Sequence, residues 1–373
     1  MAGRFKQGIA AALWLLYHTY NYIQPACKKK LRDVINLPSL DIGIDLGTST
    51  ILAGNTSGIL LKEPSVVAVN KKNGKVIAIG ESVYKMIGRT PEYIDVIRPL
   101  SDGVISDYRL TGVLIKHMLK TICKNHLLKP RVIICVPSGI TGIESQSVIE
   151  AAVEAGARRV HLIEEPVAAA LGAGVDITKP NGNLIVDIGG GTTDVAVISL
   201  RGIVCKTSVK VAGQAFDEAI IRQIKNAHGL LIGEKTAENV KMQIGSVISD
   251  SENPCTDAKG RDMISGLPCK VPVYRAELVP ILKEIAEQIL AATQRVLEIT
   301  PPELVGDIRT NGIIMTGGGS LLHGLDKYIT EGTKVETRVA ENTVECVAMG
   351  TMKSFSLLGN LYDGFLDLPS HAH

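Results

Sequence analysis

Two stretches of the sequence place an aspartate between an apolar run and a turn of glycine and hydroxyl residues. They span residues 42–50, which contain Asp45, and residues 184–193, which contain Asp187. Glycine allows a turn to bring backbone N–H groups close to an anion, and threonine or serine adds hydroxyl donors. A carboxylate at the end of the preceding strand can hold a hydrated Mg²⁺ against phosphate oxygens. Because both turns have the same aspartate offset, the pair predicts two β-hairpins whose tips face one cleft.

Three further segments are compatible with the same chemistry. An acidic pair ending at Glu165 precedes Pro166, and residues 317–319 are three glycines after an apolar run. Consecutive glycines permit close backbone approach to a base or a phosphate, whereas acids before proline are also ordinary at a helix start. Glu238 and Lys241 are three residues apart and therefore share a helix face. Taken alone, they are more typical of a solvent-exposed ion pair.

The elements that must position these residues alternate between strands and helices, which indicates an α/β fold. Short β-branched runs predict strands at residues 42–46, 66–69, 76–79, 131–136, 184–188, 195–200 and 313–316. Apolar residues at three- and four-residue steps predict helices at residues 111–124, 144–155, 166–173, 216–226, 236–244 and 276–299. Residues 250–270 are rich in Ser, Asp, Gly and Pro, and we expect an irregular surface excursion there.

Composition excludes several classes of protein. The 373 residues are enough for about two domains, and with 45% hydrophobic residues the chain can form a large core. A net charge of +2 and only 4% aromatic residues argue against nucleic-acid binding by bulk charge or by base stacking. The seven cysteines form no CxxC pair, so we expect neither a zinc site nor a disulfide framework, and a reducing cytosol fits.

The first forty residues differ from the rest of the chain. Arg4 and Lys6 precede a mainly apolar stretch at residues 9–23, and residues 28–30 are lysines. The uninterrupted apolar part is shorter than the ~20 residues that a membrane-spanning helix needs. We expect a helix that lies on a membrane surface. A signal peptide, a poorly ordered extension and an untranslated upstream segment are the alternatives.

Taken together, five segments resemble the actin-like ATPase superfamily, which includes heat-shock chaperone ATPases and sugar kinases, and they occur in its order. They are the hairpin at residues 45–50, a connecting segment near residues 136–141, the acidic segment at residues 163–170, the hairpin at residues 187–193 and the glycines at residues 317–321. More narrowly, residues 41–357 resemble the MreB family, the bacterial actins that guide cell-wall growth. Residues 97–108 and 300–305 are especially similar to that family. The resemblance implies two related lobes, each a mixed β-sheet flanked by helices, with a nucleotide cleft between them. Lobe I would comprise residues 41–179 and 345–373 with an insert at about 68–100, and lobe II residues 180–344 with an insert at about 216–277.

The resemblance also implies roles for matching residues. Asp45 and Asp187 correspond to the carboxylates that hold Mg²⁺ through water. Glu165 and Thr192 correspond to the pair that positions the attacking water, with Asp187 completing the catalytic group. The implied nucleotide-binding residues are Thr48, Ser49, Thr50, Gly190, Gly191 and Thr192 at the phosphates, and Glu238, Asn239, Val240, Lys241, Gly318, Gly319, Ser320 and Leu321 around the adenosine. Related bacterial proteins commonly have asparagine at the position of Thr50, so a modest change in nucleotide affinity is expected.

The implied function is a weak ATPase whose hydrolysis of ATP, with Mg²⁺, is coupled to polymerisation. The expected partners are further copies of the chain in a filament, the inner face of the cytoplasmic membrane, and proteins of the cell-wall synthesis machinery. The expected location is therefore cytoplasmic and peripheral at that membrane. A chaperone-like ATPase, a small-molecule kinase and an adaptor that binds ATP but barely hydrolyses it are the alternatives. The chain ends soon after the last adenosine segment, which argues against a C-terminal peptide-binding domain.

A second membrane contact is expected between a helix and a strand. Leu127 and Leu128 lie between Lys124 and Lys129, so the leucines could insert into a bilayer while the lysines meet anionic head groups. The residues alone favour burial of both leucines in the local core. In the MreB family the matching loop inserts into the membrane, and the resemblance therefore favours insertion.

Overall fold

The computed structural model describes residues 40–101, 103–124, 129–249, 251–358 and 365–366. The chain divides into two compact units, residues 1–40 and residues 41–373, and the account below concerns the second unit. The expected surface helix before residue 40 and the leucine pair Leu127–Leu128 both lie outside the described residues. None of the helices within those ranges is both long and apolar enough to cross a bilayer.

A six-stranded sheet has the strand order β19-β10-β9-β1-β2-β3. The strands are β1 (Asp41–Leu46), β2 (Thr50–Asn55), β3 (Gly58–Pro64), β9 (Arg131–Val136), β10 (Arg159–Glu164) and β19 (Phe365–Leu366). β1 and β2 form the first predicted hairpin, and β9 pairs parallel to β1 on its other side. The central strands are buried on both faces, which explains why their sequences are nearly continuous apolar runs.

A five-stranded sheet repeats this arrangement. Its order is β13-β12-β11-β17-β18, with β11 (Asn183–Ile188), β12 (Thr193–Ser199), β13 (Gly202–Val209), β17 (Ile313–Thr316) and β18 (Thr337–Val339). β11 and β12 form the second predicted hairpin, and β17 pairs parallel to β11. Each sheet therefore begins with three consecutive antiparallel strands, and the next strand of the sheet pairs parallel to the first. The internal repeat that the two glycine turns predicted is confirmed at the level of topology.

The six predicted helices are present and begin one to three residues earlier than expected. They are α4 (Tyr108–Ile122), α5 (Gly142–Glu154), α6 (Glu165–Gly172), α7 (Gly213–His228), α8 (Glu234–Ile244) and α9 (Arg275–Ile299). Caps explain two of the starts, because Asp107 accepts a hydrogen bond from the backbone N–H of Leu110 and Thr141 forms a capping box with Glu144. The sequence analysis missed α10 (Pro302–Asn311), α11 (Leu325–Thr333) and α12 (Thr343–Lys353).

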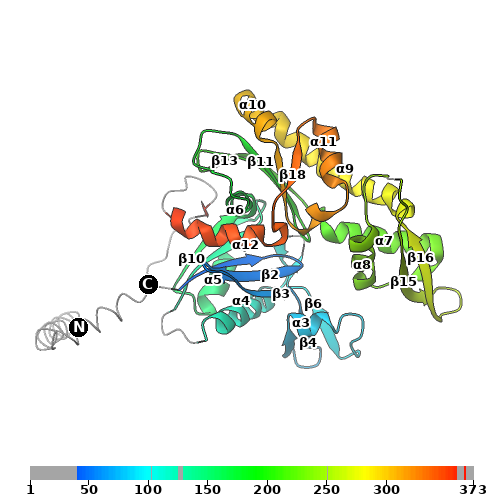
Figure 1. Ribbon diagram of the computed structural model, residues 1–373. Helices are drawn as coiled ribbons and strands as arrows, with labels where there is room; N and C mark the ends of the chain where they lie inside the picture. Colours follow the sequence, from blue (N-terminus) through cyan, green and yellow to red (C-terminus); the bar gives the residue numbers. More distant parts are fainter. Residues whose placement is uncertain (1–39, 102, 125–128, 250, 359–364, 367–373) are drawn as a thin grey trace, which may run out of the picture. The chain divides into compact units, whose positions relative to one another are not determined.

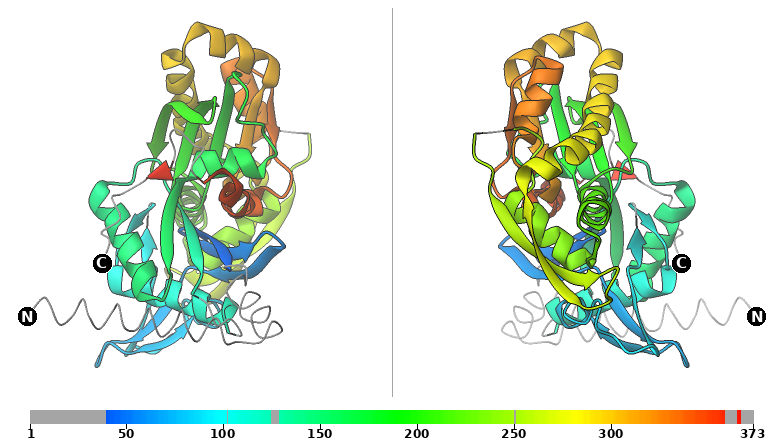
Figure 2. Two further views of the ribbon diagram at one scale, coloured as in Figure 1. Left: turned by 90° about the vertical axis from the view of Figure 1, so that its left-hand side faces the viewer. Right: turned by 90° about the vertical axis from the view of Figure 1, so that its right-hand side faces the viewer.

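Helices α6 and α12 lie side by side between the two sheets (Figure 1). Their backbones approach closely, since a Cβ atom added to Gly350 would lie 2.6 Å from the carbonyl carbon of Ala168 and 2.8 Å from the amide nitrogen of Gly172. One buried cluster contains side chains of both helices together with Ile133 of β9 and Ile185 of β11. On the other side of the five-stranded sheet, the long helix α9 runs beside the strands (Figure 2, right).

Three smaller β-structures extend from these layers. β4 (Val67–Asn70), β5 (Val76–Ile79) and β6 (Ile94–Ile97) form a sheet that packs on α3 (Glu81–Tyr84). β7 (Leu100–Ser101) pairs with β8 (Val104–Ile105). The expectation of an irregular segment at residues 250–270 is wrong, because β15 (Cys255–Asp262) and β16 (Pro268–Tyr274) form a hairpin next to β14 (Leu230–Leu231). In β15 only Ala258 is buried, so the strand has little apolar signal in its sequence.

Candidate functional site

A cavity of about 590 Å³ receives residues from both large sheets and from α6, α7 and α8. Its volume lies in the range of small-molecule sites, roughly 300–1,000 Å³. Most of the residues expected to bind a nucleotide or a metal line this cavity: Asp45, Thr48, Ser49, Thr50, Glu165, Asp187, Gly190, Thr192, Glu238, Lys241, Gly318, Gly319 and Leu321. Segments far apart in the sequence therefore meet around one space.

Four expected residues are not part of the cavity lining. Gly191 is buried, Asn239 is exposed, and Val240 packs in the hydrophobic core around the five-stranded sheet. The hydroxyl of Ser320 is buried and donates a 2.6 Å hydrogen bond to the carbonyl oxygen of Gly317. Conversely, the cavity is lined by residues that the sequence analysis did not identify, namely Gly213, Phe216, Asp217, Met242, Gln243, Arg275, Leu322, His323, Val344 and Val347.

The turns of the two glycine hairpins touch each other. A Cβ atom added to Gly190 would collide with the Ser49 hydroxyl and would lie 2.9 Å from the Cβ of Ser49 and 3.2 Å from its amide nitrogen. Only glycine allows this approach. Helix α7 begins against the second turn, because the N–H of Gly213 donates to Gly189 and that of Gln214 donates to Gly190. The two turns and the start of α7 thus meet along one wall of the cavity, and glycine turns of this kind can approach an anion closely.

Two buried aspartates lie beside these turns. Asp45 at the end of β1 is 8% exposed, and Asp187 at the end of β11 is 4% exposed. Burial raises the pKa of Asp45 to about 7, and the negative charge of Asp187 adds to that increase. Burial likewise raises the pKa of Asp187 to about 7, although the hydroxyl of Thr316 donates a 2.6 Å hydrogen bond to this carboxylate. The two hairpins therefore present their aspartates to each other.

Glu165 faces the same group of carboxylates from the first position of α6. Burial is the main cause that raises its pKa well above the usual range, and the charges of Asp194, Asp187 and Asp45 raise it further. Asp194 accepts a 2.9 Å hydrogen bond from the backbone N–H of Ser138. The sequence analysis did not identify Asp194, although an aspartate within a strand whose every residue is buried is a signal that could have found it.

Such a concentration of buried acid groups is unfavourable without a compensating cation. Among the residues that the structure describes, no group of three or more His, Cys, Asp or Glu side chains is placed to hold a metal ion directly. Mg²⁺ retains several waters and prefers carboxylate and phosphate oxygens. The donor set around Asp45 and Asp187 fits an Mg²⁺ ion that is held through water beside a bound phosphate.

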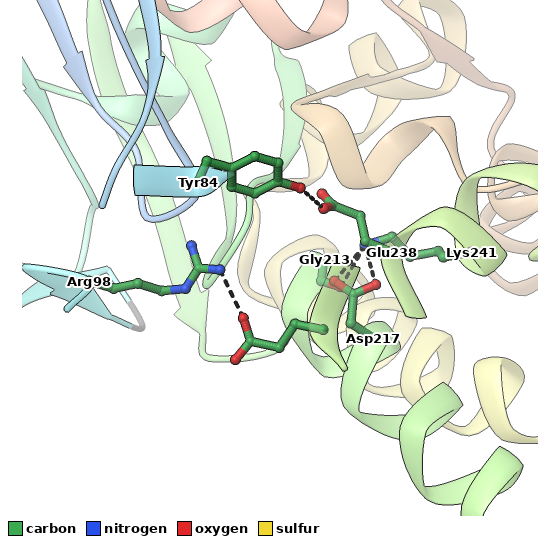
Figure 3. Close-up of polar contacts among 7 residues, drawn as sticks. Tyr84, Arg98, Gly213, Asp217, Glu238 and Lys241 are labelled. Atoms are coloured by element: carbon green, nitrogen blue, oxygen red, sulfur yellow. Dashed lines mark hydrogen bonds and ion pairs between the residues drawn. The ribbon is translucent and has the colours of Figure 1, made fainter. Parts of the chain in front are cut away.

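Three further residues of the cavity lining, Asp217, Glu238 and Lys241, take part in a network of polar contacts (Figure 3). Lys241 forms a 2.9 Å ion pair with Asp217 and donates a 2.9 Å hydrogen bond to the carbonyl oxygen of Gly213. Glu238 accepts a 2.7 Å hydrogen bond from the phenol of Tyr84. The side chains of Glu238 and Lys241 therefore contact other partners, and the alternative of a solvent-exposed pair between them does not describe this site.

Comparisons with known proteins give a consistent result. The family described as MreB/Mbl protein matches residues 39–361. The cell shape-determining protein Mbl of Bacillus subtilis is 49% identical over 83% of this chain and 94% of its own length. The cell shape-determining protein MreB of Escherichia coli K12 is 42% identical over 88% of this chain and 96% of its own length.

Solved structures agree with this match. The structure of MreB5 of Spiroplasma citri bound to ADP superposes with a TM-score of 0.82 at 39% identity, over 86% of this chain and 97% of that chain. A second structure of MreB5 is bound to AMPPNP.

Proposed function

Because this chain belongs to the MreB/Mbl protein family and has the actin-like fold, we propose that it binds and hydrolyses ATP with Mg²⁺ and assembles into filaments. We propose further that these filaments lie at the inner face of the cytoplasmic membrane and organise the cell-wall synthesis machinery that sets cell shape. The names of the curated relatives and the nucleotides bound to MreB5 support this assignment.

One observation carries the nucleotide-binding part of the proposal. The two glycine turns meet at Ser49 and Gly190, and the buried aspartates Asp45 and Asp187 stand directly behind them. Backbone N–H groups and the hydroxyls of Thr48, Ser49, Thr50 and Thr192 would bind the phosphates from both sides. The adenosine would lie between Glu238 and Lys241 on one wall and Gly318, Gly319 and Leu321 on the other.

Asp45 and Asp187 would hold Mg²⁺ through water. Bound there, the ion would neutralise charge that develops on the γ-phosphate during transfer to water. Glu165 would orient the attacking water in line, together with Thr192, and donors at the two turns would stabilise the phosphate oxygens. Since phosphoryl transfer needs mainly positioning and electrostatic stabilisation, a weak ATPase requires no further nucleophile.

The lobe boundaries remain part of the proposal. Lobe I would contain the six-stranded sheet, and lobe II the five-stranded sheet. The pairing of β19 with β10 supports a return of the chain to lobe I after residue 345. The sheet of β4, β5 and β6 would be the insert of lobe I, and the segment from α7 to the β15–β16 hairpin would be the insert of lobe II.

Electron microscopy of the purified protein on anionic lipid, with and without ATP, tests the filament proposal. We expect membrane-bound filaments with ATP and few or none without it. Sedimentation combined with measured ADP release separates the alternatives. ADP release that depends on a small-molecule acceptor, without pelleting, would favour a kinase and contradict the filament proposal.

Two segments are proposed to contact the membrane, residues 1–40 and the pair Leu127–Leu128. Liposome co-sedimentation of a Leu127→Ser/Leu128→Ser variant and of a chain lacking residues 1–39 separates their contributions. We expect the double substitution to reduce binding. If it leaves binding unchanged while the deletion abolishes it, the extension is the anchor and the assignment of the loop is wrong.

A further inference from the structure

An ion pair joins the two large sheets next to the catalytic carboxylate. The Lys206 ammonium nitrogen lies 2.6 Å from Glu164 Oε2. Lys206 belongs to β13, an outer strand of the five-stranded sheet, whereas Glu164 is the last residue of β10 in the six-stranded sheet. This contact spans the boundary between the two sheets immediately before Glu165.

Glu164 requires this partner because its side chain is only 3% exposed. A buried carboxylate without a counter-charge costs several kcal/mol. Glu164 occupies the N-cap position of α6, where an acidic side chain often accepts hydrogen bonds from the helix, but it makes no such capping bond here. Its carboxylate is instead directed across the boundary to Lys206.

The strand register places a second contact on the same face of β13. Lys206 is opposite Ala196 of β12, and Ser208 is opposite Asp194. Residues two apart in a strand point to the same side, so Lys206 and Ser208 face the same layer. Burial raises the pKa of Asp194, and the Ser208 side chain lowers it. One face of β13 therefore carries both Lys206, which holds the neighbour of Glu165 in the chain, and Ser208, which lies opposite Asp194.

We propose that Lys206 is a positioning residue for Glu165 that acts through Glu164. The inference rests on the proposed ATPase function. By holding Glu164, Lys206 fixes the first turn of α6 and hence the direction in which Glu165 presents its carboxylate to the attacking water. Without Lys206, Glu164 is left as an unpaired buried charge among other acids, and the start of α6 must move to reach solvent.

This arrangement predicts an effect on turnover rather than on nucleotide affinity. Lys206 does not line the cavity, and the predicted nucleotide contacts come from the two turns, α8 and residues 317–321. An interaction that positions a group for the transition state changes kcat, whereas uniform loss of binding changes affinity. A general loss of structure would change both.

The test uses the full chain with Mg²⁺ and compares kcat for ATP hydrolysis with the Kd for AMPPNP. We expect Lys206→Met to lower kcat by about tenfold or more, which corresponds to at least ~1.4 kcal/mol of transition-state stabilisation, and to change Kd by less than about threefold. Lys206→Arg keeps the charge and should retain kcat within about twofold. Glu164→Gln combined with Lys206→Met removes both charges and should be more active than Lys206→Met alone.

Lys270→Met is the matched control, because Lys270 forms a 2.7 Å ion pair with Asp257 between strands but both side chains are at least half exposed. Its kcat should equal that of the wild type. An unchanged kcat in Lys206→Met, or equal changes in kcat and Kd that Lys206→Arg does not rescue, overturns the role of Lys206 while the proposed function stands. Absence of ATP turnover in the wild type overturns the proposed function, and this inference with it.

Discussion

The phenol of Tyr84 donates a 2.7 Å hydrogen bond to Glu238 Oε2, and this contact connects α3 with α8, which lines the cavity. A second contact runs in parallel, since Arg98 forms a 3.0 Å ion pair with Glu234 at the start of α8 (Figure 3). The ammonium group of Lys235 lies 4.0 Å from the centre of the Tyr84 ring. Because Glu238 also lines the cavity, these contacts join the segment that contains Tyr84 and Arg98 to one wall of the cavity.

We predict that Tyr84→Phe accelerates nucleotide release. The substitution removes the hydroxyl but keeps the ring, so the loss is that of one hydrogen bond to a charged group, about 1.5–3 kcal/mol. Stopped-flow displacement of a fluorescent ADP by excess ATP measures the rate. Tyr93→Phe, at an exposed tyrosine of the same segment, is the control. An unchanged dissociation rate for Tyr84→Phe would show that the contact does not limit release.

Glu165→Ala and Glu238→Ala should have opposite effects. Glu165 is proposed to orient the attacking water, so its loss should lower kcat by about 10²-fold or more while ATP binding survives. Glu238 lines the cavity and is proposed to contact the adenosine, so its loss should weaken affinity with little change in kcat at saturation. Single-turnover hydrolysis and equilibrium binding separate the two parameters. Equal loss of binding and turnover in Glu165→Ala would contradict the assigned role.

Gly190→Ala should weaken ATP binding because the added methyl group would lie 2.9 Å from the Cβ of Ser49 and force the two turns apart. We expect at least a tenfold rise in Kd, about 1.4 kcal/mol. Gly306→Ala is the control, since a Cβ atom there meets nothing within 4 Å and alanine favours the helix. Isothermal titration with AMPPNP gives both constants. Equal affinities in the two variants would mean that the turns do not clamp the phosphates.

Without nucleotide, the free energy of unfolding should fall as the pH rises from about 4 to about 7. Burial raises the pKa of Asp45 and of Asp187 from 3.8 to about 7, so over this range the folded protein keeps protons that the unfolded chain has released. The stabilisation is complete below the pKa of the unfolded chain and is lost above the pKa of the folded protein. Each pKa unit between the two is equivalent to about 1.4 kcal/mol. Urea denaturation at several pH values measures the slope.

Asp45→Asn and Asp187→Asn should flatten this pH dependence, because an amide does not titrate. Asp257→Asn alters an exposed ion pair and should leave the slope as in the wild type. A slope that persists in both buried variants would show that other groups cause it.

Local sequence rules predicted much of the fold. The strand–aspartate–glycine pattern was sufficient for both hairpins, because turn chemistry and strand burial act over a few neighbouring residues. The same rules failed for β15, whose side chains are mostly exposed, and for α12, where threonine, valine and glycine lower helix propensity and packing against α6 compensates. The formation of β15 and α12 therefore depends on tertiary contacts rather than on local sequence.

Site residues could be predicted where they belong to one short segment of the sequence. They were harder to predict where side chains from distant segments meet. The turns that contain Ser49 and Gly190 can be predicted from the glycine and hydroxyl residues in their own short segments. The contact of Tyr84 with Glu238 joins positions 154 residues apart, and no local pattern indicates it. Asp194 lies within an apolar strand, which was a signal in the sequence, but its position beside Glu165 follows only from the packed structure.

The close approach of α6 and α12 has a mechanical consequence. At Gly172 and Gly350 no side chain separates the two backbones, and α12 contacts β1 while α6 contacts β11. Because side chains of both helices also share one buried cluster, the helices cannot separate without creating voids in a dense interior. We therefore expect the contact between α6 and α12 to act as a pivot, so that α3, which carries Tyr84, moves away from α8 while α6 and α12 stay in contact.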